Sequence, residues 1–79
     1  MKQRVYLTFS KDTVREPLIW KAGHEFDVIT NIRTAEVKED MGLVGLEIEG
    51  AQNAVEQALV WFKAQGVHVE PIEQNVIEG

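Results

Sequence analysis

The sequence contains no cysteine, a single serine and two prolines among its 79 residues. Without cysteine the chain can form no disulfide, zinc–thiolate site or iron–sulfur cluster. A domain of this length must therefore gain its stability from close packing or from a second copy of itself. No apolar run approaches the roughly 18 residues that a membrane span needs, and the first residues lack the apolar stretch of a signal peptide. We therefore expect one domain covering residues 1–79, located in the cytoplasm.

Positive charge is also scarce. The chain carries 8 lysines and arginines against 13 acidic residues, which gives a net charge of −5 and a pI near 4.9. The cations lie mostly in the first part of the chain, and the last third is mainly acidic. Proteins that read a phosphate backbone need a clustered basic face. This charge balance excludes nucleic acid as the expected partner.

The residues that catalysis and metal binding require are missing as well. Ser10 has no G-x-S-x-G context or similar setting. His24 and His68 have no ligating partner three or four positions away. The glycines at 42 and 45 belong to a predicted hairpin rather than to a phosphate loop. We predict that the protein is not an enzyme and holds no metal or cofactor.

Hydrophobic periodicity predicts a regular succession of elements. Alternating apolar residues indicate strands over 5–9, 28–37, 43–49 and 67–70, and helical spacing indicates helices over 17–26 and 51–65. Pro17 suits a first helical turn, and Gly23 is expected to allow close packing of that helix. Gly42 is expected to adopt a positive φ in the hairpin turn over 39–42, and Gly66 to end the second helix. Pro71 requires the last strand to end or to lie at an edge.

This β-α-β-β-α-β order predicts an α+β fold of the ferredoxin-like type. Right-handed crossovers give a four-stranded antiparallel sheet in the order 4-1-3-2, with both helices on one face. The residues Arg4, Glu47, Glu49 and Glu70 are expected on the opposite, outer face, as loose ion pairs rather than as an acid–base device. The predicted core consists of Val5, Leu7, Phe9, Leu18, Ile19, Ala22, Phe26, Ile32, Val44, Leu46, Ile48, Val55, Leu59, Phe62, Val67 and Val69.

The second strand is the most unusual segment. Asparagine is disfavoured in strands, yet Asn31 lies in the middle of this one. Unbroken alternation places Asn31 on the outer face together with Arg33, Ala35 and Val37. An amide that donates and accepts, a cation and a small apolar surface would suit an amino-acid-like ligand. The alternative is a solvated asparagine and an arginine that protects a sheet edge against aggregation.

Two tryptophans lie beside the apolar stripes of the two helices. Trp20 is predicted on the first helix and Trp61 on the second. Partial burial against the core is one interpretation. The other is a contact with a partner protein, because tryptophan is enriched among interface anchors.

The segment Asn31-Ile32-Arg33 resembles the Asn-Ile-Leu signature of the NIL domain. The resemblance extends over most of the chain, including the stretches 5–9, 17–28, 58–62 and 67–70. NIL domains occur at the C-terminal end of the ATPase subunit of methionine ABC importers, where they bind methionine and restrain transport. They also precede a ferredoxin module in proteins of sulfur assimilation. The segment from Glu70 onward resembles the linker to that module.

The resemblance implies a methionine-sensing regulatory domain that forms a homodimer, often through the sheet, with an ABC transporter ATPase or a ferredoxin module as its partner. By position, Asn31 corresponds to a residue of the methionine site and Val37 to an apolar residue near the ligand. The expected ligand-binding residues are therefore Asn31, Ile32, Arg33, Ala35 and Val37. Arg33 departs from the motif, which has leucine there. The alternative function is a protein-interaction module without a small-molecule ligand, docking through the open sheet face or Trp61.

Overall fold

The structure is a computed structural model that describes residues 1–72. The elements, in chain order, are β1 (Lys2–Phe9), the 3₁₀-helix η1 (Thr13–Arg15), α1 (Leu18–Glu25), β2 (Val28–Val37), β3 (Gly42–Gly50), α2 (Gln52–Ala64) and β4 (His68–Pro71). Most of the segment that resembles a linker, from Glu73 on, lies outside the described residues.

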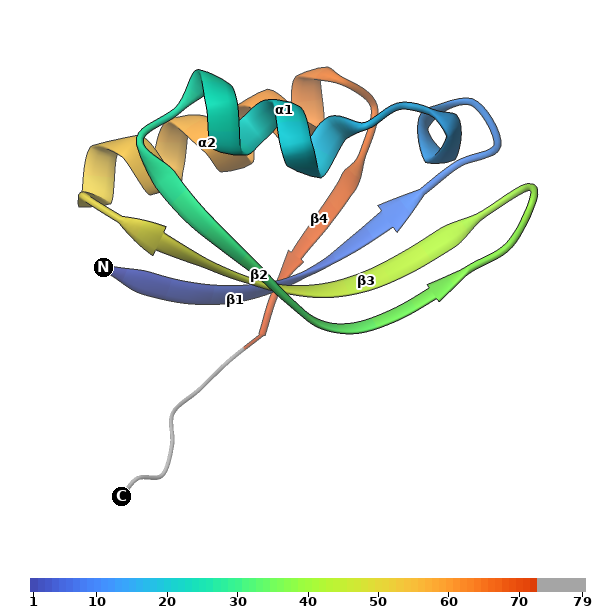
Figure 1. The fold of residues 1–79 in the computed structure, drawn as a ribbon, viewed down its shortest axis with the longest axis horizontal. Helices are drawn as coiled ribbons and strands as arrows, with labels where there is room; N and C mark the ends of the chain where they lie inside the picture. Colours follow the sequence, from blue (N-terminus) through green and yellow to red (C-terminus); the bar gives the residue numbers. More distant parts are fainter. Residues whose placement is uncertain (73–79) are drawn as a thin grey trace.

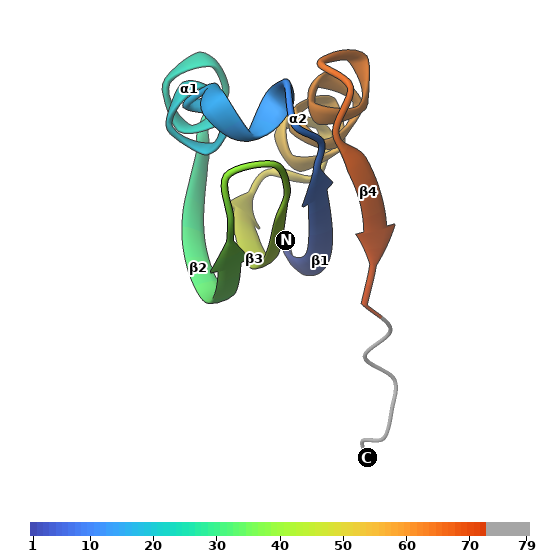
Figure 2. The ribbon, with the colours of Figure 1, turned by 90° about the vertical axis from the view of Figure 1, so that its right-hand side faces the viewer.

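The four strands form one antiparallel sheet in the order β2-β3-β1-β4. Both helices cover the same face of this sheet (Figure 1), and the end-on view in Figure 2 shows the strands side by side beneath them. The predicted ferredoxin-like fold is therefore confirmed. Pro71 ends β4, which lies at one edge of the sheet as its missing N–H requires. Within residues 1–72, no helix is both long and apolar enough to cross a membrane.

The core lies between the helices and the inner face of the sheet. Its largest fully buried side chains come from both layers and are those of Phe62, Leu7, Leu46, Ile48, Val5 and Val55. Ile32 was also predicted in the core, but its side chain is 53% exposed. That prediction is wrong because β2 is an edge strand, and only its first residue, Val28, is buried beneath the helical layer.

The first connection contains a turn that periodicity did not predict. Ser10 and Thr13 hydrogen-bond each other, the Ser10 amide donating to Thr13 Oγ1 over 2.8 Å, and η1 follows. Short polar side chains of this kind often compete with regular structure by bonding nearby backbone. As a result the side chain of Val14 packs against the core rather than pointing into solvent. Helix α1 then begins at Leu18, one residue later than predicted.

The glycines behave differently from one another. Gly66 has φ +96° and follows α2, as predicted for a helix-ending residue. Gly42, by contrast, does not have a positive φ, and it is the first residue of β3. The hairpin turns over 38–41 instead, where the Lys38 amide donates to the Met41 carbonyl over 2.8 Å. Gly23 has open space where a side chain would lie, so close packing does not explain it.

Candidate functional site

Strand β2 forms the edge of the sheet opposite β4. It pairs with β3 on one side, and every residue from Asn31 to Val37 is exposed. An edge strand presents unpaired N–H and C=O groups that another strand or a ligand can bind. All five predicted ligand-binding residues therefore lie on an accessible strand.

A β-bulge interrupts β2 between Ile32 and Thr34. Ile32 pairs with Leu46 and Thr34 with Gly45, so Arg33 has no partner residue in β3. Such an extra residue reverses the alternation of every side chain that follows it. The bulge therefore exchanges the faces of the second half of the strand.

The predicted grouping of side chains is wrong for this reason. Ala35 pairs with the buried Val44 and shares the inner, helix-covered face with Ile32 and Val37. Asn31 pairs with Glu47 on the outer face, and Arg33 lines a separate hollow there. The structure thus brings three predicted residues together on the inner face and leaves Asn31 and Arg33 on the other side of the same strand.

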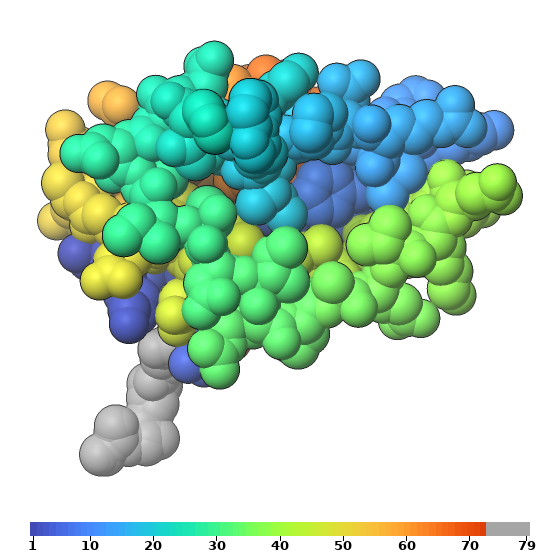
Figure 3. Space-filling view, viewed as in Figure 1, coloured from blue at the N-terminus to red at the C-terminus, as the bar shows by residue number. Residues whose placement is uncertain are grey.

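The three inner residues line an apolar groove between α1 and the second half of β2, which we call the β2 groove. Figure 3 shows it as a recess between α1 in teal and β2 in green. Its volume is about 220 Å³. The lining residues are Phe9, Val14, Glu16, Pro17, Leu18, Ile19, Trp20, Ile32, Ala35, Val37 and Val44. Glu16 is the one charged residue of this set, so the groove favours an apolar group.

The two tryptophans have different surroundings. Trp61 is half-buried and packs edge-on against Phe26 and Phe62, with ring centroids 6.0 and 5.4 Å away. Trp20 is 61% exposed, stacks on His24 at 3.9 Å and borders the β2 groove. Partial burial is thus correct for Trp61, whereas Trp20 offers an aromatic surface beside the groove.

The outer face carries one well-defined ion pair. Arg4 Nε donates to Glu47 Oε2 over 3.1 Å, and the Glu47 side chain is only 13% exposed. This hydrogen bond lowers the pKa of Glu47; burial opposes the effect, and the charges of Lys2, Arg4 and Arg33 add to it. The predicted ion pairing of Arg4 is therefore confirmed for Glu47.

Glu47→Gln is expected to lower stability near neutral pH but not in acid. The folded-state pKa of Glu47 lies below its ordinary value of 4.5, so its contribution is complete above that value. It is lost as the pH falls through the lower folded-state pKa. Urea unfolding at pH 7 and pH 3 measures this, and Glu39→Gln in the hairpin is the matched charge control. An equal loss at both pH values would contradict the linkage.

The sequence did not reveal the residues that complete these surfaces. Pro17, Trp20 and Phe9 reach the groove from segments that were interpreted as core or as helix start. Gly45, in the middle of β3, could have indicated the irregular pairing with β2, because glycine inside a strand often marks a bulge or a close backbone approach. Within the described residues, no three histidine, cysteine or acidic side chains gather as a metal site would require.

Comparisons with known proteins agree with the fold described above. The family model described as NIL domain matches residues 3–71. A solved structure, the crystal structure of the C-terminal domain of an ABC transporter ATP-binding protein from Enterococcus faecalis, has the same fold with a TM-score of 0.80. It is 19% identical, and the match covers 92% of this chain and 86% of that one. No curated protein matches this chain.

Proposed function

This chain belongs to the NIL domain family, and we propose that it is a small-molecule-binding regulatory domain whose ligand is methionine or a related sulfur amino acid. The ligand binds along the free edge of β2. Its side chain enters the β2 groove, and its charged main-chain groups lie at the strand edge. The domain senses the ligand and performs no catalysis.

The observation that carries this proposal is the apolar groove directly beside the signature strand. Ile32, Ala35 and Val37 belong to the segment that begins with the Asn-Ile motif, and all three line the groove. A volume of about 220 Å³ is smaller than the sites of drug-sized ligands and fits a ligand of amino-acid size. Trp20 at the border supplies an aromatic ring, and thioether sulfur makes favourable contacts with aromatic rings.

The polar part of the ligand requires groups that both donate and accept. The Asn31 amide does both, and Asn31 directly precedes Ile32, so the two side chains flank the same edge from opposite faces. Because successive side chains of a strand point to opposite faces, a ligand at the strand edge can contact Asn31 on one face and Ile32 on the other. Arg33 contributes through its backbone, since the bulge leaves that residue without a partner in β3. Its side chain is directed to the outer face.

The proposed regulatory role rests on an analogy with a similar domain of known structure. The similar Enterococcus faecalis domain is the C-terminal domain of an ABC transporter ATP-binding protein. By analogy, we propose that this chain acts as a homodimer and regulates an ABC transporter ATPase. A ferredoxin module is the alternative partner. Methionine shifts the balance between two dimer arrangements, and it can do so only by binding one of them more tightly.

A thermal-shift titration of the chain against the common amino acids tests the ligand. Methionine is expected to raise the melting temperature selectively and saturably. Binding to the folded state alone adds about 2.7 kcal/mol at a hundredfold excess over Kd, which corresponds to roughly 10–20 °C in a domain of this size. Asn31→Ala is expected to abolish the shift while the unliganded protein still melts cooperatively.

Asn53→Ala, which removes the same amide from the exposed side of α2, is the matched control and should respond as the wild type does. An unchanged methionine response in Asn31→Ala would show that the site assignment is wrong. The absence of a response to every amino acid would favour the second candidate, a protein-interaction module. The exposed Trp20 supports that candidate, and Trp20→Ala would then remove partner binding without changing the fold.

A further inference from the structure

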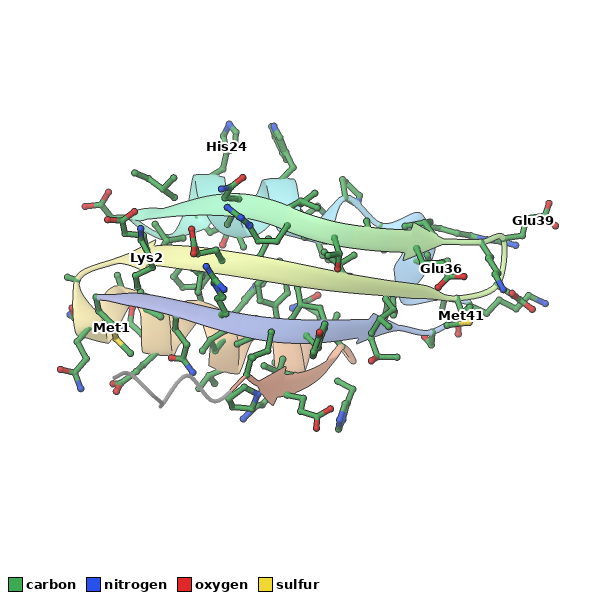
Figure 4. The ribbon with its side chains drawn as sticks, turned by 90° about the horizontal axis from the view of Figure 1, so that it is seen from below. Met1, Lys2, His24, Glu36, Glu39 and Met41 are labelled. Atoms are coloured by element: carbon green, nitrogen blue, oxygen red, sulfur yellow. The ribbon has the colours of Figure 1, made fainter. Side chains whose placement is uncertain are left out.

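The outer face of the sheet carries a hollow that the proposed methionine site does not use. Figure 4 looks onto this face, which neither helix covers, with Lys2 and Glu36 towards opposite ends of the strands. The hollow has a volume of about 200 Å³. We call it the Gly45 hollow; it is lined by Arg4, Tyr6, Arg33, Thr34, Gly45, Leu46 and Ile72.

The hollow exists because glycine occupies the middle of a central strand. Gly45 pairs with Tyr6 of β1 and with Thr34 of β2, and both neighbours present their side chains on the same face. A Cβ at Gly45 would lie 2.9 Å from Thr34 Oγ1 and 3.5 Å from the Tyr6 ring. Any side chain here would therefore fill the floor of the hollow and displace Thr34.

The bulge adds the second feature. Without it, position 34 would face the helices, but the extra residue places Thr34 opposite Gly45 and Arg33 at the rim. Bulges commonly redirect side chains at binding sites. The two guanidinium groups of Arg33 and Arg4 thus border the same small depression from β2 and β1.

The polar groups around the hollow are mainly hydrogen-bond donors. Arg4 uses its Nε for Glu47 and keeps its other N–H groups, while Arg33 makes no ion pair among residues 1–72. Tyr6 and Thr34 add hydroxyl groups, and Ile72 adds an apolar side. Two carboxylates adjoin lining residues of the hollow: Glu47, which is paired with Arg4, and Glu70, opposite Tyr6 in β4.

We propose that the Gly45 hollow binds a small organic carboxylate with a short apolar chain. Guanidinium groups recognise carboxylates through paired N–H···O bonds, and the Tyr6 ring and Ile72 provide contact for the chain. The ligand carries no ammonium group, because the residues that line the hollow include two arginines and no carboxylate to pair with a second positive charge. This separates the site from the amino-acid site at the β2 edge.

Titration of the full chain with isovalerate, followed by backbone amide NMR at constant ionic strength, tests the proposal. Saturable shifts are expected at Gly45, Tyr6 and Thr34, and isovaleramide, the neutral analogue of the same shape, should produce none. Arg33→Gln should weaken isovalerate binding about tenfold, because each charge-assisted hydrogen bond is strong. Arg15→Gln removes the same charge from η1, away from the hollow, and should bind as the wild type does.

Several results would overturn the proposal. These are equal shifts with isovaleramide, an equal loss of affinity in Arg15→Gln, or shifts that follow protein concentration, which would assign the hollow to a contact between copies. Asn31→Ala separates the two sites, since it should abolish the methionine response and leave the isovalerate titration unchanged. Gly45→Ala should remove isovalerate binding. If the Gly45→Ala protein does not fold, the affinity of Arg33→Gln for isovalerate tests the proposal by itself.

Discussion

Phe62→Ala is expected to leave much of the chain unfolded at physiological temperature. Phe62 has 0% exposure and belongs to the cluster that joins α2 to Leu7 and Leu46 of the sheet. Truncating a buried phenylalanine costs about 3–5 kcal/mol, including the cavity left behind. A domain of this length has a total stability of roughly 4–12 kcal/mol. The substitution therefore removes a large part of the stability, or all of it.

Urea denaturation followed by circular dichroism measures this loss. Val60→Ala is the control, because Val60 lies on the same helix with 63% exposure. Its replacement should change stability by less than about 0.5 kcal/mol, since valine on a helix surface contributes little packing and alanine is the better helix former. A wild-type midpoint for Phe62→Ala would contradict the assignment of the core.

Two glycine-to-alanine substitutions are expected to change stability in opposite directions. At Gly50, a Cβ would lie 2.7 Å from the backbone oxygen of Asp27 and 3.2 Å from Val28 Cγ1. That backbone is restrained by β2, where Val28 pairs with Gly50 itself. Gly50→Ala must therefore shift the sheet edge and should cost about 1–3 kcal/mol, lowering the melting temperature by roughly 5–20 °C.

Gly23→Ala is the opposite case. Gly23 is exposed in the interior of α1, and a Cβ there meets nothing within 4 Å. Alanine should stabilise the helix by about 0.5–1 kcal/mol because glycine loses more backbone freedom on folding. Thermal melts of both variants test the pair. If Gly50→Ala melted at or above the wild-type temperature, the close approach of β3 to Asp27 would be wrong.

The order of elements was accessible from the sequence because it depends on local patterns. Alternation in β1 and β3, helical spacing in α2, and the positions of Gly66 and Pro71 each have a local physical cause, and all agree on one topology. The NIL-like segment on β2 was also recognisable from neighbouring residues alone. Agreement between independent local signals is what makes a fold predictable.

The arrangement of the site required the tertiary structure. The one-residue bulge at Arg33 depends on how β2 pairs with β3, and alternation within β2 itself contains no sign of it. It moved Ala35 and Val37 into a groove with Trp20 of α1, and it placed Thr34 opposite Gly45. The exposure of Ile32 likewise depends on which strand lies at the edge.

The sequence by itself determined the fold class and indicated β2 as the strand that carries the NIL-like segment, because periodic burial and turn chemistry act over a few neighbouring residues. Only the tertiary structure decided which side chains of that strand face the same space. Strand pairing across the sheet selects the register, and a shift of one residue reverses the direction of every side chain beyond it.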